Sequence, residues 1–158
     1  MDLEFRKTSE FEKGTIYSLL KDAYSFDANY EKTFNQDWLD FDSFFFSNPD
    51  IADNYGFITV LDGIPIGLVS WNPQHRPEYV EIGHNCIATK YKGNGYGKRQ
   101  LLEAVTRIKK YSDLQKIIVT TNDNLIAKYN YQSVGFHLTK RTACNLFFGD
   151  YLLFEIDL

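Results

Sequence analysis

The sequence is poor in the features that mark secreted, metal-binding and membrane proteins. It has two cysteines, Cys86 and Cys144, whose spacing matches no metal site, so we expect reduced, structural thiols. The longest apolar runs are only a few residues, such as Phe44–Phe46, which argues against a membrane-spanning segment. The N-terminal stretch MDLEFRKTSEF has no apolar signal core, and this favours a cytoplasmic protein.

Basic residues are also scarce. The chain has 17 Lys and Arg against 21 Asp and Glu, for a net charge of -4, which argues against nucleic acid or an anionic membrane as a partner. The acids concentrate between Leu20 and Asp50, where few bases accompany them. This stretch is either an ordinary solvated face or a surface that attracts a cationic substrate, and the sequence leaves both readings open.

A chain of 158 residues is long enough for one domain with a hydrophobic core and too short for two domains of typical size. It contains no repeat, low-complexity tract or linker. We therefore expect a single domain over residues 1–158. The sequence leaves the oligomeric state open, and a homodimer is among the states that it allows.

The first half of the chain predicts a strand, two helices and a hairpin. LEFRKT alternates like a strand, and Ser9 with Glu12 forms a capping box before a helical apolar pattern. A second helical stripe carries Phe34, Trp38, Phe41 and Phe45. The stretch YGFITVLDGIPIGLVSW predicts two strands joined at Asp62–Gly63, because this dipeptide favours a two-residue turn.

The second half predicts a parallel unit followed by a hairpin. EYVEIGHNCIAT predicts a long strand, residues 101–111 an amphipathic helix, and KIIVTT a buried strand of the parallel type. NDNLIAKYNYQSVGF predicts a helix that ends at Gly135, and HLTKR can pair with YLLFEIDL. The order β-α-α-β-β-β-α-β-α-β-β predicts an α/β (α+β) fold with a central βαβ unit.

The glycine-rich stretch KGNGYGK, residues 92–98, lies between a predicted strand and a predicted helix. Helix N-termini carry unsatisfied N–H groups, and glycines let the backbone approach a ligand without a Cβ in the way, so the stretch suits a phosphate or diphosphate. The spacing fits neither a P-loop nor a dinucleotide fingerprint. A glycine turn without a ligand remains the alternative.

The stretch resembles the diphosphate-binding loop of the GNAT superfamily of acetyl-CoA-dependent N-acetyltransferases, Arg/Gln-x-x-Gly-x-Gly/Ala. Lys92 takes the Arg/Gln position, a departure that keeps the charge but loses the planar fork, and Gly95 and Gly97 take the small positions. The stretch from Asn124 to Phe136 resembles the family's Asn-x-x-Ala…Tyr-x-x-x-Gly-Phe helix. The resemblance implies a mixed, mostly antiparallel sheet flanked by helices, with a splayed cleft for acetyl-CoA as acetyl donor.

The resemblance also implies a set of cofactor-binding residues. Backbone of the strand before the loop would hold the pantetheine arm and the acetyl group, with the Ile87 N–H as the best oxyanion donor. The cofactor-binding residues so expected are Cys86, Ile87, Ala88, Lys92, Gly93, Asn94, Gly95, Tyr96, Gly97, Lys98 and Asn124. An N-terminal cap, which Asn122 or Asp123 could equally supply, is the alternative role for Asn124.

Two side chains are expected to carry the proton transfers. Tyr131 takes the position of the family tyrosine that protonates the departing thiolate, although Tyr129 is close and a packed tyrosine is the alternative. Glu81 has a spacing that resembles family members with a strand glutamate as base, acting directly or through water; a structural role is equally open. His84 is either a structural histidine or a catalytic one. No metal is expected.

The function implied is transfer of an acetyl group from acetyl-CoA to an amine by direct attack, with a small molecule as acceptor. The aromatic and acidic region from Ser9 to Phe46 favours a small amine with apolar character, and a protein N-terminus or lysine is not excluded. A non-catalytic acyl-CoA-binding or regulatory module on the same fold is the alternative. A protein that binds the phosphates of a nucleotide with the same loop is a further alternative.

Overall fold

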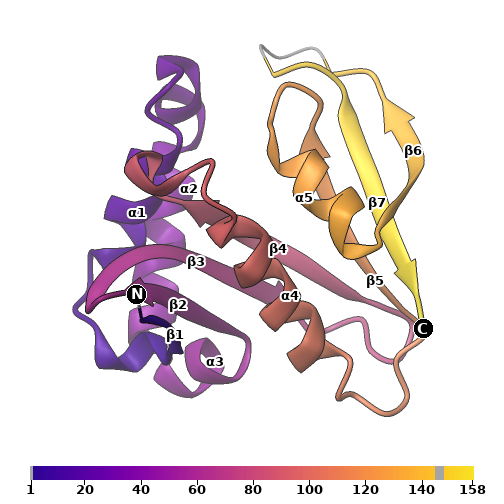
Figure 1. The fold of residues 1–158 in the computed structure, drawn as a ribbon, viewed down its shortest axis with the longest axis horizontal. Helices are drawn as coiled ribbons and strands as arrows, with labels where there is room; N and C mark the ends of the chain where they lie inside the picture. The colour runs from indigo at the N-terminus through magenta and orange to yellow at the C-terminus, as the bar shows by residue number, and fades with distance from the viewer. Residues whose placement is uncertain (1, 145–147) are drawn as a thin grey trace. The chain divides into compact units, whose positions relative to one another are not determined.

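The computed structural model describes residues 2–144 and 148–158, and Figure 1 shows the order of their elements. These elements are β1 (Leu3–Arg6), α1 (Thr15–Ala23), α2 (Ala28–Ser47), α3 (Pro49–Asn54), β2 (Gly56–Leu61), β3 (Ile64–Asn72), β4 (Val80–Ile87), α4 (Tyr96–Ile108), β5 (Lys116–Asn122), α5 (Ala127–Val134), β6 (His137–Thr142) and β7 (Tyr151–Asp157). Short 3₁₀ turns span Thr8–Glu10 and Thr89–Tyr91. Only α3 is missing from the predicted order. Its N-terminal proline, Pro49, was an available sign of a helix start.

The described strands form one sheet of seven in the order β1-β2-β3-β4-β5-β7-β6. Strands β1–β2, β2–β3, β5–β7 and β7–β6 pair antiparallel, and β4 pairs with β5 in parallel. The ladder between β4 and β5 joins Val80–Ile82 to Ile117–Val119, and β4 continues beyond it to Ile87. The predicted mixed, mostly antiparallel sheet with helices is confirmed.

The chain divides into two compact units, which we describe separately. The first comprises Met1–Ser70 and His84–Tyr96, and the second comprises Trp71–Gly83 and Gly97–Leu158. Strands β3 and β4 contribute residues to both. The expectation of a single domain over residues 1–158 stays a prediction.

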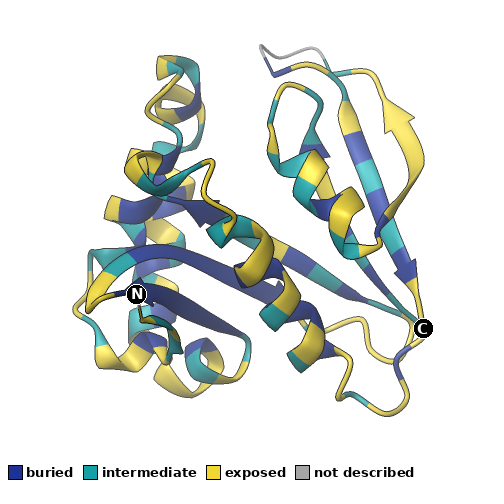
Figure 2. Ribbon diagram, viewed as in Figure 1, coloured by how far each residue is buried: buried dark blue, intermediate teal, exposed yellow. Residues whose placement is uncertain are grey.

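The first unit has an apolar core of strand and helix side chains. Every residue of β2 is buried, which makes it a continuous dark band in Figure 2. Helix α1 buries one stripe at the predicted helical spacing: Ile16, Leu19, Leu20 and Ala23. In α2, Trp38 and Phe45 of the predicted aromatic stripe are buried. The predicted turn between β2 and β3 is confirmed, because Asp62 and Gly63 both have positive φ, at 49° and 82°.

The start of α1 differs from the prediction. Ser9 and Glu12 do not cap it: the Ser9 backbone N–H donates to the Asp53 carboxylate at 3.0 Å, and α1 begins only at Thr15. Two N–H groups at its start donate instead to Asp42 of α2, a residue that is 3% exposed. The Asp42 carboxylate accepts hydrogen bonds from Gly14 N at 3.0 Å and Tyr17 N at 2.9 Å. A carboxylate that is distant in sequence therefore performs the expected cap's role.

Replacing Asp42 with alanine should lower the free energy of unfolding by about 2–3 kcal/mol, because two part-buried N–H groups lose a charged acceptor. Asp40→Ala is the matched control, since Asp40 is exposed on the same helix and accepts from Gln36. Chemical denaturation of both variants measures the difference. An equal, small loss in the two variants would contradict the capping role of Asp42.

The second unit is built around α4, β5 and β7. Helix α4 buries Leu101, Ala104, Val105 and Ile108, as predicted, and β7 alternates buried and half-buried residues. Figure 2 shows β6 as an exposed edge strand, in line with the exposure of each of its residues. Helix α5 ends at Gly135, with φ 109°, as predicted. Within residues 2–144 and 148–158, no helix is long and apolar enough to cross a membrane.

Candidate functional site

The glycine-rich loop has the backbone geometry that the sequence predicted. Gly93 and Gly95 have φ of 79° and 84°, in the left-handed region that side chains avoid. A Cβ built on either glycine would meet no protein atom within 4 Å, so both face open space. Helix α4 begins directly after them at Tyr96. Such a helix N-terminus attracts an anion through its N–H groups and its dipole.

Side chains at the edge of this loop stabilise its shape. The Asn94 side-chain amide donates to the carbonyl oxygens of Lys92 at 3.1 Å and Tyr91 at 3.3 Å. The Asp22 carboxylate at the end of α1 accepts a hydrogen bond from the Thr89 N–H at 2.7 Å, and the Thr89 hydroxyl donates to the Asp22 carbonyl at 2.8 Å. These bonds join the loop to the C-terminal end of α1 within the first unit.

The side chain of Lys92 is used within the protein. Its ammonium donates to the Ala23 carbonyl at the end of α1 and lies 4.9 Å from the centroid of the Phe26 ring. Burial lowers the pKa of the Lys92 ammonium from its usual value. Lys92, which takes the Arg/Gln position of the motif, therefore joins the loop to α1. Nothing local in the sequence indicated this contact.

The end of β4 contains the residues expected to act through their backbone. Cys86 and Ile87 are buried, and burial raises the pKa of the Cys86 thiol to about 12, so the thiol stays protonated. The Ala88 N–H donates to the Ile66 carbonyl at 2.7 Å, so this amide is already used within the protein. A ligand at this end of β4 would have to use other backbone groups.

Upstream on β4 lie the two candidate bases. Glu81 is half-buried and lies opposite Ile118 in the ladder with β5. His84 is half-buried, and its ring packs on Phe41 of α2 with 4.2 Å between centroids. Burial lowers the pKa of the His84 imidazole, and the negative charge of Asp37 partly opposes this shift.

An aromatic cluster extends from the end of α1 along α2. Tyr24 stacks on Trp38 with 5.6 Å between centroids, and Tyr30 lies 5.4 Å from Phe26 and 6.2 Å from Phe34. Tyr30 and Trp38 are buried, whereas Phe26 is 56% exposed. The cluster thus combines a fixed inner part with an exposed ring, which suits contact with an apolar ligand.

Tyr131 and Asn124 belong to the second unit. Tyr131 of α5 is 3% exposed, and its ring lies 5.7 Å from Phe136 and 5.9 Å from Phe154. Tyr129 is 61% exposed and so differs sharply from Tyr131. Asn124 does not cap α5, because Ile126 is the flanking residue and no side chain forms the cap. Asp123 instead pairs with Lys128 at 2.8 Å.

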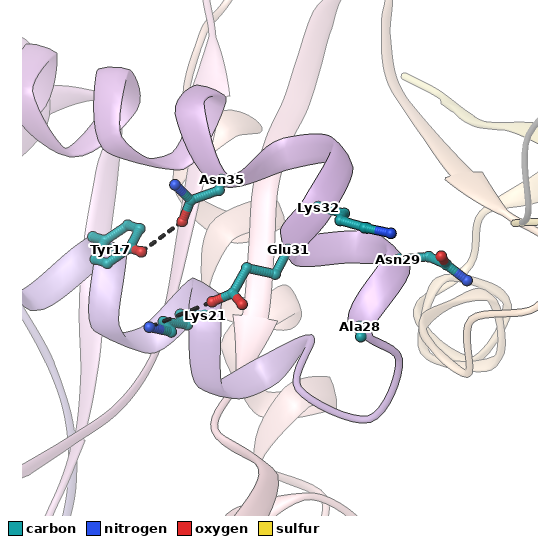
Figure 3. Close-up of a pocket in the computed structure, with 7 residues that line it drawn as sticks. All are labelled: Tyr17, Lys21, Ala28, Asn29, Glu31, Lys32 and Asn35. Carbon is teal, nitrogen blue, oxygen red and sulfur yellow. Dashed lines mark hydrogen bonds and ion pairs between the residues drawn. The ribbon is translucent and has the colours of Figure 1, made fainter.

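A polar hollow between α1 and α2 was not predicted (Figure 3). It has a volume of about 610 Å³ and is lined by Tyr17, Lys21, Ala28, Asn29, Glu31, Lys32 and Asn35. The Tyr17 hydroxyl donates to the Asn35 side-chain oxygen at 2.6 Å, and Lys21 pairs with Glu31 at 3.4 Å. Its polar groups largely bind one another, and no sequence motif marks it.

In the part of the chain that the structure describes, no group of three or more His, Cys, Asp or Glu residues could hold a metal ion.

A comparison with models of known protein families identifies the family of this chain. The Acetyltransferase (GNAT) family matches residues 15–136, which include the loop, β4 and Tyr131. No curated protein matches the chain.

Solved structures share the fold at low sequence identity. YncA from Salmonella typhimurium, solved with its cofactor acetyl-CoA, has a TM-score of 0.78 at 14% identity, over 99% of this chain and 94% of its own. The PaiA N-acetyltransferase from Thermoplasma acidophilum, in complex with coenzyme A, has a TM-score of 0.72 at 18% identity over 100% of both chains. A GNAT-family acetyltransferase from Streptococcus pneumoniae has a TM-score of 0.73 at 19% identity over 99% of both chains. The chain belongs to the GNAT family of acetyltransferases.

Proposed function

We propose that this protein is an N-acetyltransferase that moves an acetyl group from acetyl-CoA to an amine, most naturally a small molecule. The main support for this proposal is the glycine-rich loop. Gly93 and Gly95 have left-handed backbone conformations, both face open space, and helix α4 starts at Tyr96. Family membership and the coenzymes bound to YncA and PaiA support the same proposal.

The loop would bind the coenzyme's diphosphate. The N–H groups of residues 93–98 supply donors, and the dipole of α4 favours the negative charge. Lys98 is exposed at the first turn of α4 and adds a cation. Lys92 would contribute through its backbone and through the contacts that join the loop to α1, since its ammonium already binds the Ala23 carbonyl.

Three residues would carry the chemistry that the resemblance implies. The Ile87 N–H would stabilise the negative charge that develops on the carbonyl oxygen of the acetyl group. Tyr131 would give its phenolic proton to the departing sulfur, because a tyrosine hydroxyl can act as a general acid. Glu81 would assist proton removal from the amine, directly or through water. Asn124 would hydrogen-bond the pantetheine arm.

The acceptor site is proposed to use the aromatic cluster and the acids of α1 and α2. Exposed aromatic rings such as Phe26 favour an apolar or aromatic acceptor body, and the acidic excess favours its ammonium group. A protein N-terminus or lysine would present the same ammonium group and is the second acceptor class to test.

The test is turnover of acetyl-CoA with a panel of acceptors, measured as release of free thiol and confirmed by mass spectrometry of the acetylated product. We expect acetylation of apolar primary amines such as 2-phenylethylamine, and no acetylation of glutamate or aspartate. Calorimetric titration should show binding of coenzyme A and not of ATP. A preference for anionic acceptors would contradict the acceptor proposal, and binding of ATP in place of coenzyme A would contradict the function.

One observation favours a second candidate, a non-catalytic acyl-CoA-binding module. Tyr131 is almost fully buried against Phe136 and Phe154, as a purely structural tyrosine would be. Such a module would bind coenzyme A without turnover for any amine.

A further inference from the structure

We infer that Asn122, the last residue of β5, binds the coenzyme: its side-chain amide donates a hydrogen bond to an amide carbonyl of the pantetheine arm. This inference rests on the proposed function, and it goes beyond it by assigning a binding residue that lies outside the family motif. It follows from a buried nitrogen without a partner, the fixed backbone around that side chain and the free edge of β5.

The Asn122 side chain carries an unsatisfied donor. In the part of the chain that the structure describes, its Nδ2 atom is the one buried side-chain nitrogen or oxygen without a hydrogen-bond partner. Buried polar groups are nearly always hydrogen-bonded, because a donor without a partner loses its bonds to water and gains none. An asparagine of purely structural use would have a partner within the protein. The cost is recovered when a ligand supplies the acceptor.

The backbone around Asn122 is held in place. Asn122 lies opposite Tyr151 in the ladder between β5 and β7, and its carbonyl accepts the Leu125 N–H at 3.1 Å. The next residue, Asp123, donates its N–H to the Asp150 carbonyl at 2.8 Å. The unsatisfied donor is therefore not the product of a frayed strand end, and a fixed backbone presents it to a ligand.

One edge of β5 is free where Asn122 lies. The ladder with β7 covers the whole strand, Lys116–Asn122, whereas the ladder with β4 covers only Ile117–Val119. Beyond Val119, the described strands leave this second edge of β5 unpaired over residues 120–122. An extended chain that carries amides can lie along such an edge and pair with its backbone groups. The pantetheine arm is a chain of this kind, so it fits the free edge.

The charges beside Asn122 favour a neutral ligand group. Asp123 pairs with Lys128 at 2.8 Å and with Arg141 at 2.9 Å. Arg141 also pairs with Asp150 at 3.1 Å. These charged groups bind one another, and the buried amide that remains is neutral. It pairs most readily with a carbonyl oxygen, because a neutral acceptor costs less to remove from water than a carboxylate or a phosphate.

Asn124, the asparagine of the family motif, lies two residues further on and is exposed. Water competes for a hydrogen bond that an exposed amide makes, whereas a buried donor makes a stronger one. Asn122 therefore contributes more to the binding of the pantetheine arm than Asn124 does.

The experiment measures, by calorimetry, the affinities of the wild type and of Asn122→Leu for coenzyme A and for 3′-phospho-ADP, the part of the coenzyme that lacks the pantetheine arm. Leucine has nearly the shape of asparagine and no donor. Asn122→Leu should lose about tenfold in affinity for coenzyme A, as expected for one hydrogen bond, and nothing for 3′-phospho-ADP. Its melting temperature should be no lower than that of the wild type, because the variant buries no unsatisfied donor.

Asn72→Leu is the matched control. Asn72 also ends a strand, β3, but its side-chain oxygen accepts the Gln74 N–H at 2.9 Å. Its substitution should lower the melting temperature and leave both affinities unchanged. Asn124→Leu should lose less coenzyme A affinity than Asn122→Leu.

A measurement on the unmodified protein covers the case in which Asn122→Leu folds poorly. In protein labelled with ¹⁵N-asparagine, the NMR signal of the Asn122 side-chain amide should shift on addition of coenzyme A and stay in place on addition of 3′-phospho-ADP. An unshifted signal with coenzyme A would overturn the inference.

The affinities offer further contradicting results. Wild-type coenzyme A affinity in Asn122→Leu would mean that bound water satisfies the amide, and an equal loss for both ligands would mean that the residue is structural. A larger loss in Asn124→Leu would return the role to the motif residue. A wild type that binds no coenzyme A would overturn the inference and the proposed function together. One that binds it without turnover would overturn only the proposed acetyl transfer, because the affinities decide the inference.

Discussion

Replacing Gly95 with alanine is expected to lower coenzyme A affinity by about two orders of magnitude. The added Cβ would meet no protein atom within 4 Å, so it would point into the space through which the diphosphate must approach. The loss of two charge-assisted hydrogen bonds, at about 1.5 kcal/mol or more each, accounts for the estimate. Calorimetric titration of coenzyme A into wild type and variant measures the change.

The matched control is Gly63→Ala in the turn between β2 and β3. Gly63 has φ 82° against 84° for Gly95, and a Cβ there also meets nothing within 4 Å. Both substitutions therefore carry the same backbone strain, about 1–2 kcal/mol, and should lower thermal stability equally. Only Gly95→Ala should lose affinity. Equal affinity in the two variants would mean that the loop does not bind the diphosphate.

Replacing Tyr131 with phenylalanine should lower kcat by about 10²-fold, because the thiolate would leave without its proton donor. Coenzyme A affinity should change by no more than about twofold, since only the phenolic oxygen is removed. Steady-state kinetics with acetyl-CoA, together with calorimetry, separate the two effects. Thermal denaturation measures the structural cost of the buried substitution independently.

Tyr129→Phe is the control for the position of the proton donor. Tyr129 lies in the same helix and is 61% exposed, so its substitution should leave kcat and stability unchanged. A fall in kcat for Tyr129→Phe alone would transfer the role to that residue. Unchanged kcat in both variants would favour a proton source other than α5, and no turnover in the wild type would favour the non-catalytic module.

Elements whose conformation depends mainly on their own residues were predictable from the sequence. The turn at Asp62–Gly63 and the end of α5 at Gly135 depend on backbone conformations that those residues adopt readily, and the structure has both. The amphipathic helix α4 and the buried parallel strand β5 followed from apolar periodicity. The glycine loop was recognisable for the same reason: its conformation is set by its own residues.

Contacts with residues that are far away in the sequence were not predictable. Ser9 fits a local capping box, but Asp53, 44 residues away, accepts its N–H, and Asp42 takes over the start of α1. Lys92 matches a motif position, yet its ammonium binds the Ala23 carbonyl, 69 residues away. The environment of His84 likewise depends on α2. Tertiary packing selects these partners, and a single sequence carries no local record of it.

The most direct test of the account is a crystal structure of the protein with coenzyme A bound. We predict diphosphate oxygens within about 2.7–3.2 Å of backbone nitrogens in residues 93–98, at the N-terminus of α4. The contradicting result is a diphosphate held elsewhere on the chain, or no measurable affinity for the coenzyme at all.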